Sequence, residues 1–282
     1  LGSGSDRLQI QSGTVVGAVT FMGSSLVEAD SGIDSVELAG NGTFDLRAAT
    51  FLGVERLAFG GTQASNLTSN VILDGSQVGA GKINDFFDPG NTVSNKFSLT
   101  VNGSVVDLGT ATSNGVDAIT INGTSGNDVL TTISGVDSTI NGGEGDDTIT
   151  GGAYAAIANG TTPVADKLFG GGGNDTFIYR QNGSLISPGE IIDGGLGTGD
   201  RILFSGNTGD FTTAAVSGIE KFEFDGTGPH VVSLTKAQAL AIGTITGGIG
   251  NDTVQIGDSG TVDLSGLNVT NFATGDIVGN AY

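Results

Sequence analysis

The chain has no cysteine, one methionine, one histidine and only 4 prolines among 282 residues. Without cysteine, disulfide bonds and thiolate metal sites are excluded. So few prolines exclude a proline-rich linker and a collagen-like chain. No apolar run approaches the roughly 20 residues that a membrane-spanning helix needs. The sequence from Leu1 shows no signal peptide, so we expect an excised or processed piece.

Basic residues are also scarce, with 10 Lys and Arg against 30 Asp and Glu and a formal net charge of −20. A chain of this charge repels nucleic acid and anionic membranes, so we expect neither nucleic-acid binding nor membrane insertion. The folded state also repels itself unless cations are bound. Clustered carboxylates would favour divalent cations, whereas dispersed ones would only keep the surface soluble.

Glycine is abundant, with 51 of 282 residues, or about 18% against a usual share of about 7%. Hydrophobic residues still make up 37% of the chain, which is too many for a disordered sequence. The combination predicts many tight turns that join short buried strands.

Four segments share the pattern G-[GT]-x-G-[ND]-D-x-U, where U is a large apolar residue. They cover residues 123–130, 142–149, 170–177 and 247–254. A fifth segment, from residue 194, has one residue inserted before its aspartate, and a shortened sixth opens the chain.

This pattern resembles the nonapeptide G-G-x-G-x-D-x-U-x of the RTX calcium-binding repeat family. Glycine suits the turn because the turn uses positive φ angles and leaves carbonyl oxygens open. Aspartate adds a carboxylate oxygen, and calcium takes 6–8 oxygen ligands. In that family, two nonapeptides form one coil and calcium is held between neighbouring turns. The resemblance implies an all-β chain folded as a parallel β-solenoid, of the β-roll or β-helix type, with calcium-binding glycine-rich turns.

The resemblance also implies a set of ligands for several calcium ions. In the full repeats these are Gly123, Gly126, Asp128, Gly142, Gly145, Asp147, Gly170, Gly173, Asp175, Gly247, Gly250 and Asp252. The two irregular repeats add Gly194, Gly197, Asp200 and Asp6, and degraded turns on the opposite edge add Asp137 and Asp166.

The spacing of the repeats departs from the ideal of 18 residues for two nonapeptides. Asp147 follows Asp128 by 19 residues, but Asp175 follows Asp147 by 28, and Asp200 follows Asp175 by 25. Asp252 is a further 52 residues away. We therefore expect no long uninterrupted stack, but a few full sites and several partial ones.

A second repeat, G-[IV]-[DE]-x-U-x-U, occurs at residues 32–38, 53–59, 115–121 and 218–224. Its alternating apolar residues predict strands with one buried face. We expect its acidic residue to lie in solvent or to pair locally, and not to bind metal.

A third segment, from Ile83 to Leu99, resembles segments that flank RTX arrays in secreted proteases and adhesins. Asn95 and Ser98 replace two of the family's aspartates, so only Asp85 carries over as a ligand. Residues 233–242 favour a short helix capped by Ser233, and residues 151–165 are expected to form an inserted loop. We expect one elongated body of two solenoid lobes: residues 1–110 with sparse calcium motifs, and residues 111–282 with dense ones.

These features predict an extracellular calcium-binding structural or assembly module of a bacterial surface-layer protein or adhesin, exported by type I secretion. Its partners would be calcium and either further copies of itself or a cell-surface polysaccharide or protein. The alternative is a non-catalytic secretion and stability domain of a larger secreted enzyme, such as a protease or polysaccharide-modifying enzyme.

Catalysis within this chain is not expected. Candidate proton-transfer residues are scattered, and His230 is expected in an exposed turn. The chain has no H-E-x-x-H or G-x-S-x-G motif. Ice binding is not favoured either, because no regular T-x-T array repeats at coil spacing.

Overall fold

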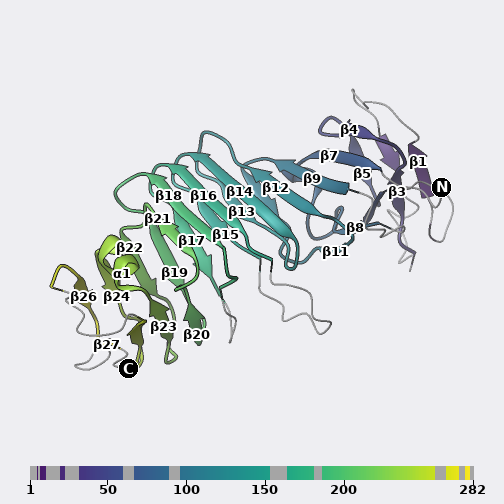
Figure 1. The fold of residues 1–282 in the computed structure, drawn as a ribbon. Helices are drawn as coiled ribbons and strands as arrows, with labels where there is room; N and C mark the ends of the chain where they lie inside the picture. Colours follow the sequence, from purple (N-terminus) through teal and green to yellow (C-terminus); the bar gives the residue numbers. More distant parts are fainter. Residues whose placement is uncertain are drawn as a thin grey trace.

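The structure is a computed structural model. It describes residues 5, 7–10, 20–22, 32–59, 67–88, 96–152, 164–180, 186–257, 265–272 and 277–279. The body is elongated, with the two chain termini at opposite ends (Figure 1). Strands pair in parallel along its whole described length, from the N-terminal to the C-terminal sheets.

Two sheets of eight described strands each run along the body. The first long sheet holds β4 (Gly42–Asp45), β7 (Thr68–Asp74), β9 (Lys96–Asn102), β12 (Ala118–Asn122), β14 (Asp137–Glu144), β16 (Lys167–Gly172), β18 (Ile191–Leu196) and β21 (Ala215–Ser217). The second long sheet holds β10 (Val105–Asp107), β13 (Val129–Thr131), β15 (Thr148–Thr150), β17 (Thr176–Tyr179), β19 (Arg201–Phe204), β22 (Lys221–Phe224), β24 (Thr244–Thr246) and β26 (Asn268–Thr270).

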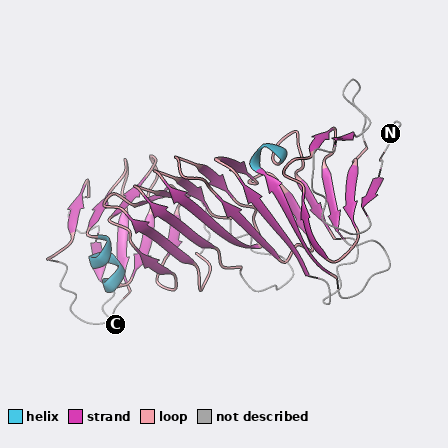
Figure 2. Ribbon diagram, turned by 90° about the horizontal axis from the view of Figure 1, so that it is seen from above, coloured by secondary structure: helices cyan, strands magenta, loops and turns pink. Residues whose placement is uncertain are grey.

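Smaller sheets and two short helices complete the two ends, as Figure 2 shows. The N-terminal sheet holds β1 (Arg7–Ile10), β3 (Ser35–Leu38), β6 (Arg56–Phe59), β8 (Asp85–Phe87) and β11 (Thr112–Asn114), and β2 (Thr20–Met22) pairs with β5 (Thr50–Leu52). The C-terminal sheet holds β20 (Thr208–Asp210), β23 (Val231–Leu234), β25 (Thr253–Ile256) and β27 (Ile277–Gly279). The helices are the 3-10 helix η1 (Gly75–Gln77) and α1 (Lys236–Ile242).

The middle of the body is a two-sided β-roll. From β12 to β19 the chain alternates between the first and the second long sheet, so one coil is one strand from each sheet. Towards either end the coils gain a third side, from the N-terminal or the C-terminal sheet. The prediction of a parallel β-solenoid is confirmed.

Seven of the eight described strands of the second long sheet each send one large apolar side chain into the core at the same register. These side chains are Val106, Leu130, Ile149, Phe177, Ile202, Phe222 and Ile245, all with 0% exposure. They include the U residues of the repeats that begin at residues 123, 142, 170 and 194, whereas Val254 of the remaining full repeat lies in β25. Burying one such side chain stabilises the fold by about 1.5–3 kcal/mol, so the stacked column holds neighbouring coils together.

The outer face of the first long sheet carries a ladder of asparagines. The Asn122 amide donates to the Asn102 side-chain oxygen at 2.9 Å, and the Asn141 amide donates to Asn122 at 2.8 Å. Such in-register side-chain pairs add stability to neighbouring strands. The chain repeats T-[VI]-N-G at this register, not the T-x-T pattern considered above.

Helix α1 begins at Lys236, because Thr235 and not Ser233 is its N-cap. The Thr235 hydroxyl accepts from the Gln238 amide, and the Gln238 side chain accepts from the Thr235 amide, which forms a capping box. Ser233 instead belongs to β23. Neither helix that the structure describes is long and apolar enough to span a membrane.

The two proposed lobes share the first long sheet, which continues from β4 to β21 across residue 110. The expected loop at residues 151–165 is described only at its ends, since residues 153–163 lie outside the described part of the chain.

We expect Ile149→Ala to lower the free energy of unfolding by about 2–5 kcal/mol, because it leaves a cavity in the stacked column. Val129, on the neighbouring strand, is 50% exposed. Val129→Ala should therefore change stability by less than about 0.5 kcal/mol. Chemical denaturation of both variants in saturating calcium measures the difference, and equal effects would contradict the assigned inward face.

Candidate metal centre

Four aspartates of the glycine-rich turns lie at one corner of the β-roll, where the chain passes from the first to the second long sheet. Asp128, Asp147, Asp175 and Asp200 each directly precede a strand of the second sheet, and these strands pair in register. The longer spacings are taken up at the opposite edge, between β15 and β16 and between β17 and β18. The expectation of an interrupted stack is therefore wrong for these four coils.

A chain of hydrogen bonds links these coils at the corner. The Asp128 amide donates to Asp147 Oδ1 at 2.9 Å, the Asp147 amide to Asp175 Oδ1 at 2.8 Å, and the Asp175 amide to Asp200 Oδ1 at 2.7 Å. The Asp200 amide donates to Glu220 Oε2 at 2.9 Å. Each backbone amide thus binds the carboxylate of the next coil, and we call residues 128, 147, 175, 200 and 220 the carboxylate row.

The second oxygen of three carboxylates in this row has no partner. Oδ2 of Asp147, Asp175 and Asp200 is buried and makes no hydrogen bond to any residue that the structure describes. These side chains are 0–1% exposed. A buried carboxylate oxygen without a hydrogen bond or a cation is costly, so these three oxygens are the candidate ligands for positive ions.

The turn glycines leave room beside these oxygens. A Cβ on Gly142 would come within 3.0 Å of both Asp147 Oδ2 and the Gly170 carbonyl oxygen. A Cβ on Gly170 would meet Asp175 Oδ2 and the Gly194 carbonyl oxygen in the same way. Each glycine therefore opens a space between a carboxylate oxygen and a carbonyl oxygen of the next coil.

Oxygen ligands of these two kinds suit calcium, which binds carboxylates and backbone carbonyls at about 2.3–2.6 Å. No three acidic or histidine side chains converge on one point within the described residues. Backbone carbonyls would therefore have to supply most ligands of each ion. The donor set fits calcium better than zinc, which favours nitrogen and sulfur.

Burial and mutual repulsion raise the pKa values of three aspartates in the row. Burial, and then the charge of neighbouring carboxylates, raises the pKa of Asp147 and of Asp175 from 3.8 to about 6. The pKa of Asp200 is raised for the same reasons. Several negative charges stacked at one corner thus destabilise the metal-free state.

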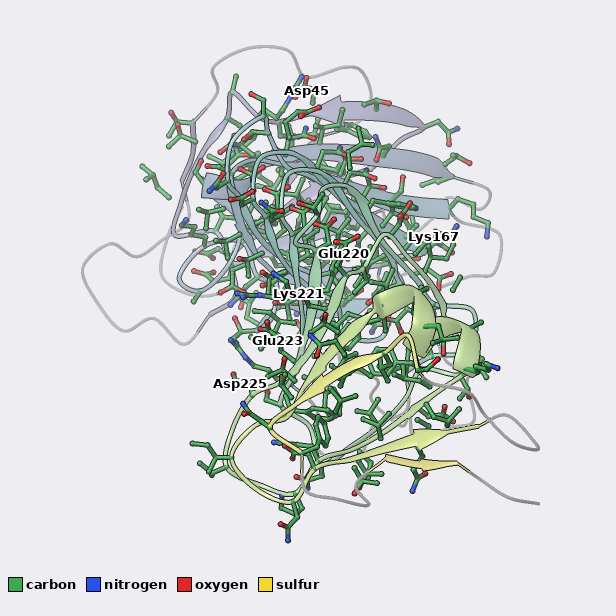
Figure 3. The ribbon with its side chains drawn as sticks, turned by 90° about the vertical axis from the view of Figure 1, so that its left-hand side faces the viewer. Asp45, Lys167, Glu220, Lys221, Glu223 and Asp225 are labelled. Atoms are coloured by element: carbon green, nitrogen blue, oxygen red, sulfur yellow. The ribbon has the colours of Figure 1, made fainter. Side chains whose placement is uncertain are left out.

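The two ends of the row differ from its middle. The Asp128 carboxylate accepts hydrogen bonds within its own turn, from both the backbone amide and the hydroxyl of Thr124. Glu220 (Figure 3), in contrast, comes from the second repeat, which was not expected to take part. The signal that could have found it is its place directly before x-U, where the other coils carry aspartate.

The expectation that these acidic residues lie in solvent or pair locally is wrong for three of them. Glu55 Oε2 accepts the Asp34 amide at 2.9 Å across 21 residues, Asp117 Oδ2 accepts the Phe97 amide at 2.7 Å across 20 residues, and Glu220 accepts the Asp200 amide across 20 residues. All three side chains link neighbouring coils.

The remaining predicted ligands lie apart from the row. Asp85 forms an ion pair with Arg56 and accepts the Thr112 hydroxyl. Asp137 is exposed at the start of β14. Asp166 is buried at the opposite edge, where it accepts the Gly152 amide at 2.7 Å and burial raises its pKa to about 7.

Two further predicted sites need separate mention. Asp6 lies outside the described residues. Asp252 lies at a different corner, where the chain passes from β24 of the second long sheet to β25 of the C-terminal sheet. The repeat that contains it therefore does not extend the carboxylate row.

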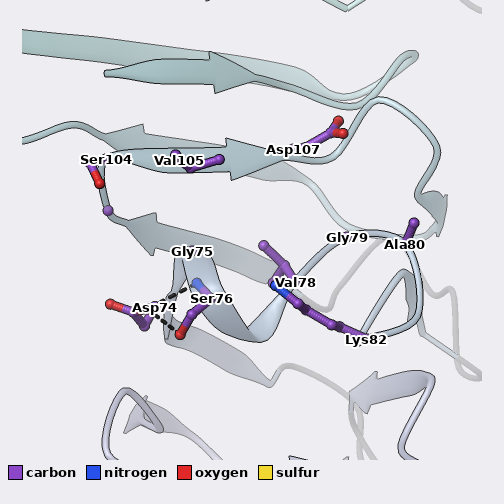
Figure 4. Close-up of a pocket in the computed structure, with 11 residues that line it drawn as sticks. Asp74, Gly75, Ser76, Val78, Gly79, Ala80, Lys82, Ser104, Val105 and Asp107 are labelled. Atoms are coloured by element: carbon purple, nitrogen blue, oxygen red, sulfur yellow. Dashed lines mark hydrogen bonds between the residues drawn. The ribbon is translucent and has the colours of Figure 1, made fainter. Parts of the chain in front are cut away.

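A cavity of about 530 Å³ lies between η1 and β10 (Figure 4). Its lining includes Asp74, Lys82, Val105 and Asp107. Asp74 is engaged by the amide and the hydroxyl of Ser76. The cavity contains none of the predicted ligands.

Comparison with known families finds the RTX calcium-binding nonapeptide repeat in four copies, at residues 120–138, 134–153, 165–180 and 244–255. These segments contain Asp128, Asp147, Asp175 and Asp252. No curated protein and no solved structure matches the chain. The sequence resemblance to RTX repeats is confirmed, and such repeats form calcium-binding structural domains.

In the absence of calcium, we expect the protein to be more stable at pH 4 than at pH 7. The pKa of Asp147 and of Asp175 is about 6 in the folded chain against 3.8 ordinarily, so the folded state binds protons more tightly than the unfolded state. This stabilisation is complete below about pH 4 and is lost as the pH rises through 6. Because the metal-free chain is expected to unfold at neutral pH, circular dichroism in excess chelator between pH 4 and pH 8 measures the effect as a folded fraction that rises as the pH falls.

Asp175→Asn is the control variant, because it removes one of the titrating charges. It should raise the metal-free folded fraction at pH 7.5 and reduce its pH dependence. A metal-free folded fraction that rises with pH across this window would show that the row is not under charge repulsion.

Proposed function

From its RTX repeats and its geometry, we propose that the chain is an extracellular, calcium-stabilised structural module of a bacterial surface-layer protein or adhesin. The observation that carries the proposal is the set of three buried, unpartnered Oδ2 atoms of Asp147, Asp175 and Asp200, each beside a glycine-lined space. Bound calcium supplies the positive charge that these oxygens lack.

Calcium at this corner would join neighbouring coils. The oxygens beside each turn glycine come from two successive coils: the carboxylate from one, and a carbonyl from the next. Ligands from both coils are in place only when the coils are stacked, so the free energy of binding becomes free energy of folding. Free calcium is scarce in the cytosol and plentiful outside the cell, so folding would follow export.

The same arrangement supports a structural role over catalysis. The RTX β-roll is a structural fold. His230, expected in an exposed turn, is instead buried with 3% exposure. Tyr179 is also buried, and its hydroxyl donates to Glu190 Oε1. Neither side chain is placed to transfer a proton to a substrate in solvent.

We expect removal of calcium to unfold at least residues 120–255. The test is a calcium titration of chelator-treated protein followed by circular dichroism, with hydrogen exchange to locate the change. Magnesium should substitute poorly, because it requires a smaller octahedral shell and keeps its waters. A β-sheet signal and melting temperature unchanged by excess chelator would refute calcium-dependent folding.

A matched pair of variants separates metal binding from hydrogen bonding in this experiment. Asp147→Ala and Glu55→Ala each remove a side chain that accepts an amide from the preceding coil. Only Asp147 has an unpartnered buried oxygen. Asp147→Ala should therefore raise the calcium concentration at the folding midpoint, and should lower stability in calcium more than Glu55→Ala does. Equal effects of the two variants would show that Asp147 does not differ from Glu55 in binding metal.

The surface role predicts assembly. In millimolar calcium we expect the protein to form ordered arrays or to bind the outer surface of the producing cell, since divalent ions would bridge its acidic faces. Electron microscopy and light scattering with calcium, and with chelator, measure this. A strictly monomeric protein that binds no cell surface in calcium would favour the alternative, a secretion and stability domain of a larger enzyme.

A further inference from the structure

The only histidine of the chain has an unusual environment. His230 lies between β22 and β23, and its Nδ1 is 2.6 Å from the Gly206 carbonyl oxygen. A carbonyl oxygen only accepts, so Nδ1 carries the hydrogen and the lone pair of the neutral ring is on Nε2. Nε2 is buried and has no hydrogen-bond partner within the described part of the chain. A buried nitrogen acceptor is therefore left free.

His230 takes the place of a repeat aspartate. Its backbone amide donates to Asp252 Oδ1 at 3.1 Å, as the amide of each aspartate in the carboxylate row donates to the acid one coil ahead. The segment Gly226-Thr-Gly-Pro-His230 also keeps the spacing G-x-G-x of the repeat, with histidine where aspartate stands elsewhere. It is thus a turn of the same kind, one coil before the turn that ends at Asp252.

The two turns face each other through backbone oxygens. A Cβ on Gly248 would lie 3.0 Å from the Phe224 carbonyl oxygen and 3.2 Å from that of Gly226, and a Cβ on Gly250 would lie 2.6 Å from the Gly228 carbonyl oxygen. Nε2 of the histidine would lie 3.6 Å from a Cβ on Gly226, which has a φ of +121°. Glycine therefore leaves space beside the carbonyl oxygens at positions 248 and 250, while Gly226 serves the positive φ of the turn beside Nε2.

The imidazole ring is held in place. The Phe224 ring stacks on it with centroids 5.8 Å apart, and the Phe204 ring meets it edge-on at 6.2 Å. Histidines that bind metal almost always donate their other ring N–H to a carbonyl or carboxylate, as His230 does to Gly206. The ring is thus already oriented for ligation through Nε2.

We propose that the turns at residues 226–230 and 247–252 form a mixed nitrogen and oxygen site for a divalent transition-metal ion such as Zn²⁺, Ni²⁺ or Cu²⁺. His230 Nε2 is the nitrogen ligand, and Asp252 and the turn carbonyls supply oxygens. Imidazole suits these ions, whereas calcium prefers an all-oxygen shell. The proposal rests on the proposed function only in that this corner is built like the calcium-binding corner.

Nuclear magnetic resonance of the imidazole tests the proposal with Zn²⁺ as the probe. The full chain, ¹⁵N-labelled and saturated with calcium, is titrated with Zn²⁺ while long-range ¹H–¹⁵N correlations of the ring are recorded. One histidine gives one set of ring signals. We expect the Nε2 signal to move from the free lone-pair position, Nδ1 to stay protonated, and the change to saturate at one equivalent.

Two variants complete the test. Asp252→Asn should weaken Zn²⁺ binding at the imidazole by about tenfold or more, whereas Glu55→Gln, remote in the N-terminal sheet, should not. In His230→Asn, Cu²⁺ spectra should lose their nitrogen ligand. An Nε2 signal that Zn²⁺ leaves unmoved, or an affinity that Asp252→Asn leaves unchanged, overturns the proposal.

The outcomes separate this site from the calcium-dependent fold. If circular dichroism responds to calcium but Zn²⁺ leaves Nε2 unmoved, the histidine site alone fails. If Zn²⁺ moves Nε2 while the fold ignores calcium, the proposed function fails and the histidine site stands.

Discussion

The middle of the molecule depends on stacking carboxylates of the same charge at one corner. Their Oδ1 atoms are bound by backbone amides of the preceding coil, so the acids cannot turn outward without breaking the ladder. The Oδ2 atoms of Asp147, Asp175 and Asp200 are buried at this corner without a hydrogen-bond partner among the described residues. The backbone hydrogen bonds that set the register thus create the negative corner, which is the corner proposed to bind calcium.

Glycine makes this corner possible. A side chain at position 142 or 170 would occupy the space between the carboxylate and the neighbouring carbonyl. Gly145 and Gly173 also have φ angles of 104° and 127°, which other residues adopt only with strain. The glycines therefore both allow the tight turns and keep the turn oxygens free of side-chain atoms.

Different interactions hold neighbouring coils together in different parts of the solenoid. The central coils combine an apolar column with the carboxylate row. The outer face of the first long sheet adds an asparagine ladder that carries no charge. At the C-terminal corner, the same amide-to-carboxylate bond joins Asp252 to a turn with histidine in the aspartate position. The same backbone hydrogen bond thus joins coils whose turns end in different side chains.

The sequence alone determined the fold class and the turns that bear the candidate ligands, because the repeat pattern needs only local rules: glycine at positive φ, aspartate after the turn, one apolar residue per strand. It could not determine which turns stack. Residues outside the corner absorb the irregular spacings, so Asp147, Asp175 and Asp200 align although the distances between them differ. Glu220 belongs to the carboxylate row and Asp252 lies at another corner, because coil register depends on hydrogen bonds between strands far apart in the chain. Only the tertiary structure decided these placements, and with them the buried position of His230.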